Sequence, residues 1–246
     1  MTQRLTLAQA ALAAVLLSRL GTPALAQIAP TEPIGISTTG QPTSFDLNPR
    51  DYEVTGYGRA RFGMSPAEVQ AVVAADHPGA RPGTDEVEPL SRRRVMVFVV
   101  PALSPGPGPA TVTYVFAPGG RRLIAVNVYW MTPGEATPAQ RDAMVAAGSA
   151  LTATLVGSYW APLATARGFV LEPGTVILFA SKDKAGRGIE VRLDGVPLDL
   201  QRPSSTGTPR PIEHLAAPAG RARLRLAVVA APGQVDSVPS IPPGAF

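Results

Sequence analysis

Apolar residues recur at the spacing of a helix face shortly after residue 65. Val69, Val72 and Val73 lie three and four positions apart, which places them on one stripe. Ser65 can cap the free N–H groups of the first turn, and Glu68 can close a capping box with it. A proline follows the cap, where its missing N–H costs nothing. The pattern predicts a short amphipathic helix that ends at the proline and glycine of 78–79.

A second helix start follows 72 positions later (137 − 65). Thr137 supplies the hydroxyl cap, Pro138 takes the first turn, and Gln140 closes the box. An apolar face then continues through Met144, Ala147, Leu151 and Leu155. We therefore predict a second, longer helix with the same kind of entry.

Apolar and alternating runs predict strands after each helix. After the first helix they cover residues 94–100, 110–117 and 122–131, and after the second they cover residues 175–181, 188–193 and 221–229. Glycines at 119–120 and 186 mark hairpin turns.

This order predicts an α+β fold of two tandem repeats, each a helix with a three-stranded antiparallel sheet. The first repeat would span 51–131 and the second 132–231. Proline-rich segments at 27–50 and 232–246 predict a flexible lead-in and a disordered tail. The alternative is one α+β domain whose two helices start alike.

The N-terminus has the features of an export signal. Arg4 precedes an apolar run over 5–17, and the small-x-small pattern of 24–26 predicts cleavage between Ala26 and Gln27. Arg19 interrupts the run too early for a retained membrane span. We expect a periplasmic or secreted protein with no membrane span after cleavage.

Composition excludes several classes of function. The chain has 246 residues and no cysteine, which rules out disulfides, thiolate nucleophiles and a lipid-modified N-terminus. Its formal net charge is +4, and losing Arg4 and Arg19 with the leader would leave +2 (4 − 2). This surplus is too small for a surface that neutralises nucleic-acid phosphates.

One short segment resembles a known family. Residues 61–69, Arg-Phe-Gly-Met-Ser-Pro-Ala-Glu-Val, resemble the Gly-Met-Thr/Ser-x-x-Glu-Val helix entry of small bacterial envelope proteins of the SmpA/OmlA type. The tandem plan is similar to that of secreted β-lactamase-inhibitor proteins. The resemblance implies a non-enzymatic protein that acts through contacts of a sheet surface and its loops. The chain departs from the envelope lipoproteins in lacking their lipidation cysteine and in having His77-Pro78-Gly79 where they show a Gly-x-Pro turn.

Ser181 and Lys184 have the Ser-x-x-Lys spacing of a serine nucleophile with a lysine base. That motif needs a helix, whereas these residues lie between two predicted strands. We favour a solvated hairpin, and a Ser-Lys hydrolase is the least favoured function.

Metal ligands are scarce in the sequence. His77 and His214 are isolated from each other and lie beside turn residues. Asp85, Glu86 and Glu88 form an acidic cluster without the glycine-punctuated spacing of a calcium loop. We expect no metal, no cofactor and no catalytic residue.

Residues 221–226 alternate strictly between arginine and apolar residues. On a strand, Arg221, Arg223 and Arg225 would share one surface while the residues between them enter the core. That surface is a possible anion-binding site. Glu190 and Asp194 alternate in the same way on the candidate strand before it, and pairing of the two strands would neutralise the arginines.

The sequence therefore indicates an exported bacterial protein that is not an enzyme. The favoured function is a protein-interaction module with an envelope or secreted partner. The alternative is a soluble binder of an anionic ligand, such as a lipid headgroup or a cell-wall fragment, through the arginine strand.

Overall fold

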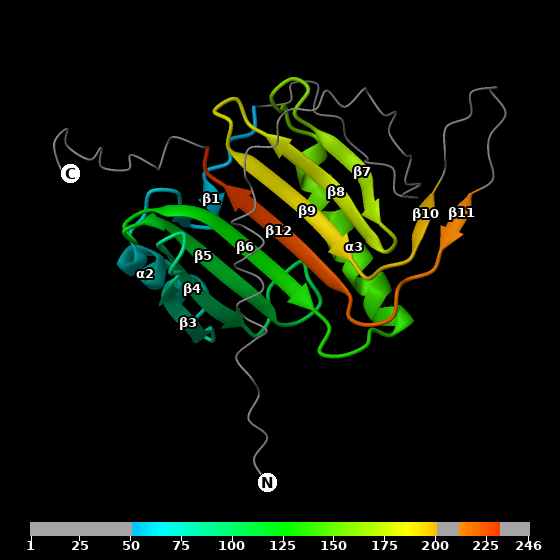
Figure 1. Ribbon diagram of the computed structural model, residues 1–246, viewed down its shortest axis with the longest axis horizontal. Helices are drawn as coiled ribbons and strands as arrows, with labels where there is room; N and C mark the ends of the chain where they lie inside the picture. Colours follow the sequence, from blue (N-terminus) through cyan, green and yellow to red (C-terminus); the bar gives the residue numbers. More distant parts are fainter. Residues whose placement is uncertain (1–50, 201–211, 232–246) are drawn as a thin grey trace, which may run out of the picture. The chain divides into compact units, whose positions relative to one another are not determined.

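Antiparallel strands are the main regular secondary structure in the described part of the chain, which is residues 51–200 and 212–231 of the computed structural model. One sheet has eight strands (Figure 1). In sheet order they are β3 (Arg81–Val87), β4 (Arg93–Val100), β5 (Ala110–Pro118), β6 (Leu123–Met131), β12 (Arg223–Val229), β9 (Gly188–Asp194), β8 (Thr175–Lys182) and β7 (Ala166–Glu172). Two-stranded sheets are formed by β1 (Gly56–Tyr57) with β2 (Ala60–Arg61), and by β10 (Leu198–Leu200) with β11 (Glu213–Leu215). The helices are α2 (Pro66–Asp76) and α3 (Pro138–Val156).

The predicted fold class is wrong. We expected two tandem repeats with a three-stranded sheet each, and the chain instead forms a mostly β structure around one large sheet. The strands of the two expected repeats are connected by β12, which pairs along its whole length with β6 on one side and with β9 on the other. This pairing removes two exposed sheet edges and buries a single apolar layer. The boundary expected between residues 131 and 132 lies in the connection between β6 and α3. Strands on both sides of this position in the sequence belong to the same eight-stranded sheet.

Both outer strands of the sheet are absent from the prediction. The β3 strand contains Pro82 and Gly83, and most of its residues are exposed, so it has neither strand composition nor alternation. The β7 strand is mainly exposed and includes Gly168 at positive φ. Edge strands of this kind are held by backbone hydrogen bonds to one neighbouring strand. The hydrophobic pattern of the strand's own sequence does not reveal this pairing.

Both predicted helix starts are confirmed. The backbone N–H of Glu68 donates to Ser65 Oγ, and the Ser65 N–H donates back to Glu68 Oε2 at 2.7 Å. The backbone N–H of Gln140 donates to Thr137 Oγ1, and the Thr137 N–H donates back to Gln140 Oε1 at 2.9 Å. The six predicted strands are also present, with ends that differ by at most two residues.

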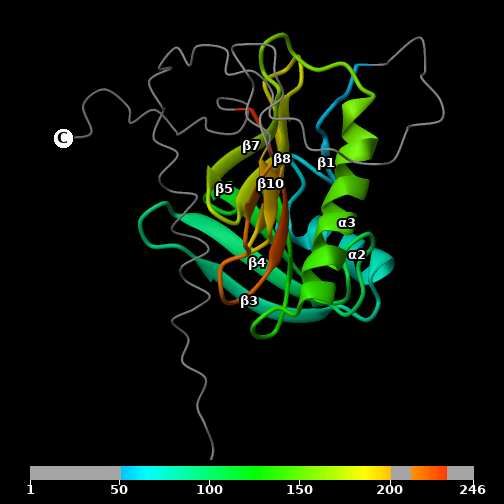
Figure 2. The same cartoon turned by 90° about the vertical axis from the view of Figure 1, so that its right-hand side faces the viewer.

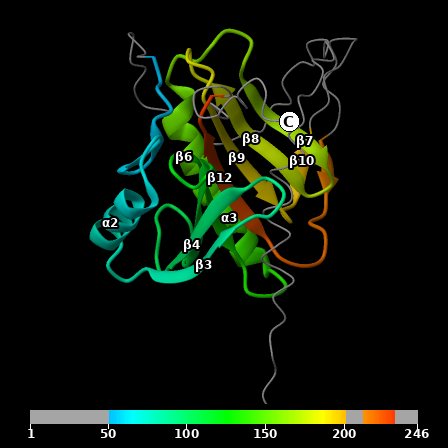
Figure 3. The same cartoon turned by 60° about the vertical axis from the view of Figure 1, so that its left-hand side comes forward.

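The two helices lie on the same side of the large sheet (Figure 2). The longer helix, α3, packs on β8, β9 and β12, while α2 lies towards the β4 side (Figure 3). Gly148 lets α3 approach closely, because a Cβ there would lie 2.6 Å from Leu178 Cδ1. Beneath the helices, the sheet buries Val100, Ala110, Trp130, Leu224, Leu193 and Val176, which face one another across six strands. This side of the sheet holds the core.

Replacing the cap of α3 should weaken the fold measurably. We expect Thr137→Ala to lower the free energy of unfolding by about 1 kcal/mol, since the Gln140 N–H loses its acceptor. Thr154→Ala is the matched control, because Thr154 is exposed in the last turn of the same helix, where its hydroxyl donates to the Leu151 carbonyl and caps no N–H group. Urea denaturation of both variants measures the difference, and an equal loss in both would contradict the assigned cap.

The export leader, the lead-in of 27–50 and the tail of 232–246 lie outside the described residues, as do the predicted cleavage residues Ala26 and Gln27. No helix in the described ranges is long and apolar enough to cross a membrane.

Candidate functional site

The second face of the large sheet has a different composition. We call it the open face, because neither helix lies on it (Figure 2). One row of half-buried residues crosses it from β8 to β4 and consists of Ile177, Arg192, Arg225, Tyr129, Thr111 and Val99. Directly paired residues share a face, so these side chains form one continuous surface.

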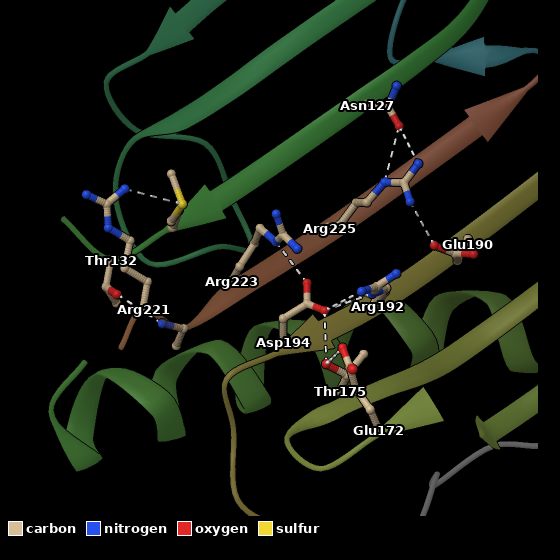
Figure 4. Close-up of polar contacts among 12 residues, drawn as sticks. Asn127, Thr132, Glu172, Thr175, Glu190, Arg192, Asp194, Arg221, Arg223 and Arg225 are labelled. Carbon is tan, nitrogen blue, oxygen red and sulfur yellow. Dashed lines mark hydrogen bonds and ion pairs between the residues drawn. The ribbon is translucent and has the colours of Figure 1, made fainter. Parts of the chain in front are cut away.

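The arginine strand lies as the alternation predicted. Ala222, Leu224 and Leu226 are buried in the core, and Arg223 and Arg225 project onto the open face. Arg221 precedes β12, and its guanidinium contacts Met131 Sδ at 3.9 Å (Figure 4).

Register places Arg225 directly opposite Arg192 on β9, which would be unfavourable if both guanidinium groups faced each other. Instead, Arg225 turns to Glu190, and Arg192 turns to Asp194. Arg192 Nε donates to Asp194 Oδ1 at 2.8 Å, and Arg223 Nε donates to Asp194 Oδ2 at 2.8 Å. Arg192 and Arg223 therefore share the carboxylate of Asp194.

Arg225 is held more completely. Its Nη1 lies 3.2 Å from Glu190 Oε1, and its Nη2 and Nε donate to Asn127 Oδ1 at 2.8 and 3.3 Å. Asn127 is buried and was missed by the sequence reasoning, although it is the one polar residue in the apolar run 123–128. The ring of Tyr129 lies between the two arginines of β12, with guanidinium carbons 5.9 Å (Arg223) and 5.8 Å (Arg225) from its centre.

Towards β4 the open face becomes apolar. Val95, Val97 and Val99 pair with Val115, Thr113 and Thr111. All three of these valines are half-buried. The open face thus combines two parts. One is a row of arginines whose charges are paired with Asp194 and Glu190, and the other is a surface of valine and threonine.

Ser181 and Lys184 do not form a catalytic pair. Ser181 is buried on β8, where its hydroxyl lies 2.8 Å from Thr165 Oγ1. Lys184 is exposed in the β8–β9 turn, and its Nζ lies 2.6 Å from Asp51 Oδ2. A strand and a turn hold them where the hydrolase motif requires a helix, so the predicted hairpin is present, although Ser181 is buried in it and not solvated.

The same turn contains a buried carboxylate that sequence reasoning missed. Asp183 Oδ2 accepts from the Val54 N–H at 2.9 Å and from Arg187 Nε at 2.6 Å, and Oδ1 accepts from the N–H groups of Ala185 and Arg187. Burial alone would raise the pKa of Asp183, but these hydrogen bonds from Val54 and Arg187 hold the pKa below its usual value. Asp183 therefore acts as a structural clamp between the turn and the start of the described chain.

The other polar candidates also have structural partners. Asp85 accepts two hydrogen bonds from Arg94, at 2.7 Å each, and His214 pairs with Asp199 at 2.7 Å. His77 ends α2. Within residues 51–200 and 212–231, no group of three or more histidine, aspartate or glutamate side chains is arranged to hold a metal.

Comparison with protein-family models, curated proteins and solved structures gives no match for this chain. The resemblance of residues 61–69 to envelope proteins stays a prediction based on those residues.

Proposed function

We propose that this chain is a non-enzymatic protein-interaction module of the bacterial envelope or exterior, and that the open face is its docking surface. The observation that carries this proposal is the asymmetry of the sheet. One face is covered by α2 and α3 (Figure 2). The other presents half-buried valine, threonine, tyrosine and arginine side chains, and neither helix lies on it.

The composition of the open face suits a protein partner. Protein interfaces mix apolar and polar area in roughly the proportions of an ordinary surface, with aromatic residues, methionine and arginine enriched. Tyr129, Met131 and the arginines of β12 provide these residue types at the centre of the sheet. The valines of β4 and the threonines of β5 extend the same surface without charge.

The alternative function, in which Arg221, Arg223 and Arg225 together bind an anionic ligand such as a lipid headgroup or a cell-wall fragment, has less support. Arg225 already directs its guanidinium to Glu190 and Asn127. An anion would have to displace these contacts before it could bind all three arginines.

Site-specific photocross-linking in cells that export the chain tests the docking surface. A benzoylphenylalanine at Thr113, on the open face, should give a discrete cross-linked species at about ten times the yield of one at Asp142, which is exposed on α3. Equal yields from both positions would contradict the proposal.

A second variant separates docking from chance proximity. Thr111→Lys, two residues away on the same face, should reduce the cross-link from position 113, because it adds an unpaired charge to the contact area. Ala146→Lys, exposed on α3, is the matched control and should leave the yield unchanged. Thermal unfolding of each variant verifies that the fold is retained.

A further inference from the structure

The charge balance of the open face differs between its two ends. We call Arg221, Arg223 and Met131 the basic corner; they lie where β12 begins and β6 ends (Figure 4). Met131 has 48% of its surface exposed, and the Arg223 side chain has 41%. The corner is accessible, whereas Arg225 and Glu190 further along the sheet are 20% and 31% exposed.

Hydrogen-bond donors remain unused at the basic corner. Arg223 donates through Nε to Asp194, and its two terminal nitrogens have no hydrogen-bond partner within the described residues. Among the described residues, the Arg221 guanidinium hydrogen-bonds only to the weakly accepting sulfur of Met131. Asp194 is already shared with Arg192. The nearest loop carries Glu135, which forms no ion pair in the described ranges. The corner therefore offers two guanidinium groups with free N–H donors, whereas the Arg225 guanidinium is occupied.

The spacing of these donors selects the form of the ligand. Arg221 and Arg223 are alternate residues of an extended segment, so their Cα atoms lie about 7 Å apart. A single small anion would need both guanidinium groups to converge. Two carboxylates on alternate residues of an extended acidic peptide match the spacing directly, and each can pair with one planar guanidinium.

We propose that the partner of this chain presents an acidic peptide segment to the basic corner. The inference rests on the proposed docking function and specifies the chemistry of the partner at one end of the docking surface. Met131 and Tyr129 lie beside the two arginines and supply apolar contact for the stems of the acidic side chains. Arg221 and Arg223 then bind the carboxylates of the peptide. The paired charges of Arg192, Arg225, Glu190 and Asp194 form the neighbouring surface against which the peptide packs.

Fluorescence anisotropy of the purified full chain tests this proposal. The probe is a labelled ten-residue peptide of alternating glutamate and threonine. We expect binding that weakens as salt rises, and about tenfold weaker binding by the Arg221→Gln/Arg223→Gln double variant. The control is Arg121→Gln/Arg122→Gln, which removes the same charge from the exposed turn between β5 and β6 and should leave the affinity unchanged.

Two further probes identify the source of any binding. The same peptide with glutamine in place of glutamate should not bind, and inorganic phosphate at millimolar concentration should not compete. Equal loss in both double variants, binding of the glutamine peptide, or full competition by phosphate would each overturn the acidic-peptide proposal. These outcomes leave the cross-link from position 113 unaffected, so failure here is distinguishable from failure of the docking surface itself.

Discussion

Truncation of Asp183 should produce one of the largest losses of stability in this protein. We expect Asp183→Ala to lower the free energy of unfolding by about 3–5 kcal/mol, the usual result of removing one partner from a buried ion pair. The Arg187 guanidinium would lose its carboxylate, and three backbone N–H groups would lose their acceptor. Asp183→Asn should lose less, because the amide oxygen can still accept part of these hydrogen bonds. Urea denaturation measures both values.

The control for this prediction is the exposed ion pair of the same turn. Asp51→Ala removes the carboxylate that contacts Lys184, and both of those side chains are more than half exposed. Solvent screening limits such a pair to less than about 1 kcal/mol. If Asp51→Ala and Asp183→Ala destabilise the fold equally, the clamp assigned to Asp183 is wrong.

Asp183 also sets part of the response to acid. Its pKa is lowered in the folded chain, so its stabilising contribution is complete above the unfolded value of about 3.9. As the pH falls below that value the unfolded state takes up the proton first, and the contribution is lost. Below pH 4 the free energy of unfolding of the native chain should therefore decline more steeply than that of Asp183→Ala, by at most about 1.4 kcal/mol per pH unit. Parallel acid limbs for the two proteins would contradict this origin.

The second large effect is expected at Trp130, which is fully buried and donates from Nε1 to the Leu103 carbonyl at 2.8 Å. Trp130→Ala should lower the free energy of unfolding by about 3–5 kcal/mol, since it leaves a cavity and an unpaired carbonyl. Tyr129→Ala, the next residue of the same strand, should lose about 1–2 kcal/mol, because its half-buried ring lies on the open face.

This neighbouring pair tests which face of the sheet is the core. Guanidinium denaturation of both variants gives the comparison. Comparable losses at Trp130 and Tyr129 would mean that the open face is packed as tightly as the helix-covered face, and the docking proposal would lose its basis. A loss at Trp130 that clearly exceeds the loss at Tyr129 is the result that we expect.

Local interactions explain the parts of the fold that the sequence predicted well. A capping box spans four residues, so Ser65 with Glu68 and Thr137 with Gln140 identify both helix starts without tertiary information. Strict alternation over 221–226 likewise fixes which side chains of β12 enter the core. The hairpin between β5 and β6 follows from two glycines at positive φ.

Tertiary structure decided how these elements are joined. The pairing of β12 with β6 connects residues about a hundred positions apart, and apolar faces on β6, β9 and β12 are equally compatible with one sheet or two. The same pairing brings Arg225 to Asn127 and makes Arg192 and Arg223 share Asp194, which leaves the free donors at the basic corner. Side-chain periodicity determines which face a residue occupies, because it depends only on the strand itself. The partner of a strand depends on the free energy of the whole sheet, and for that reason only the folded chain shows where the charges are compensated and where they remain available.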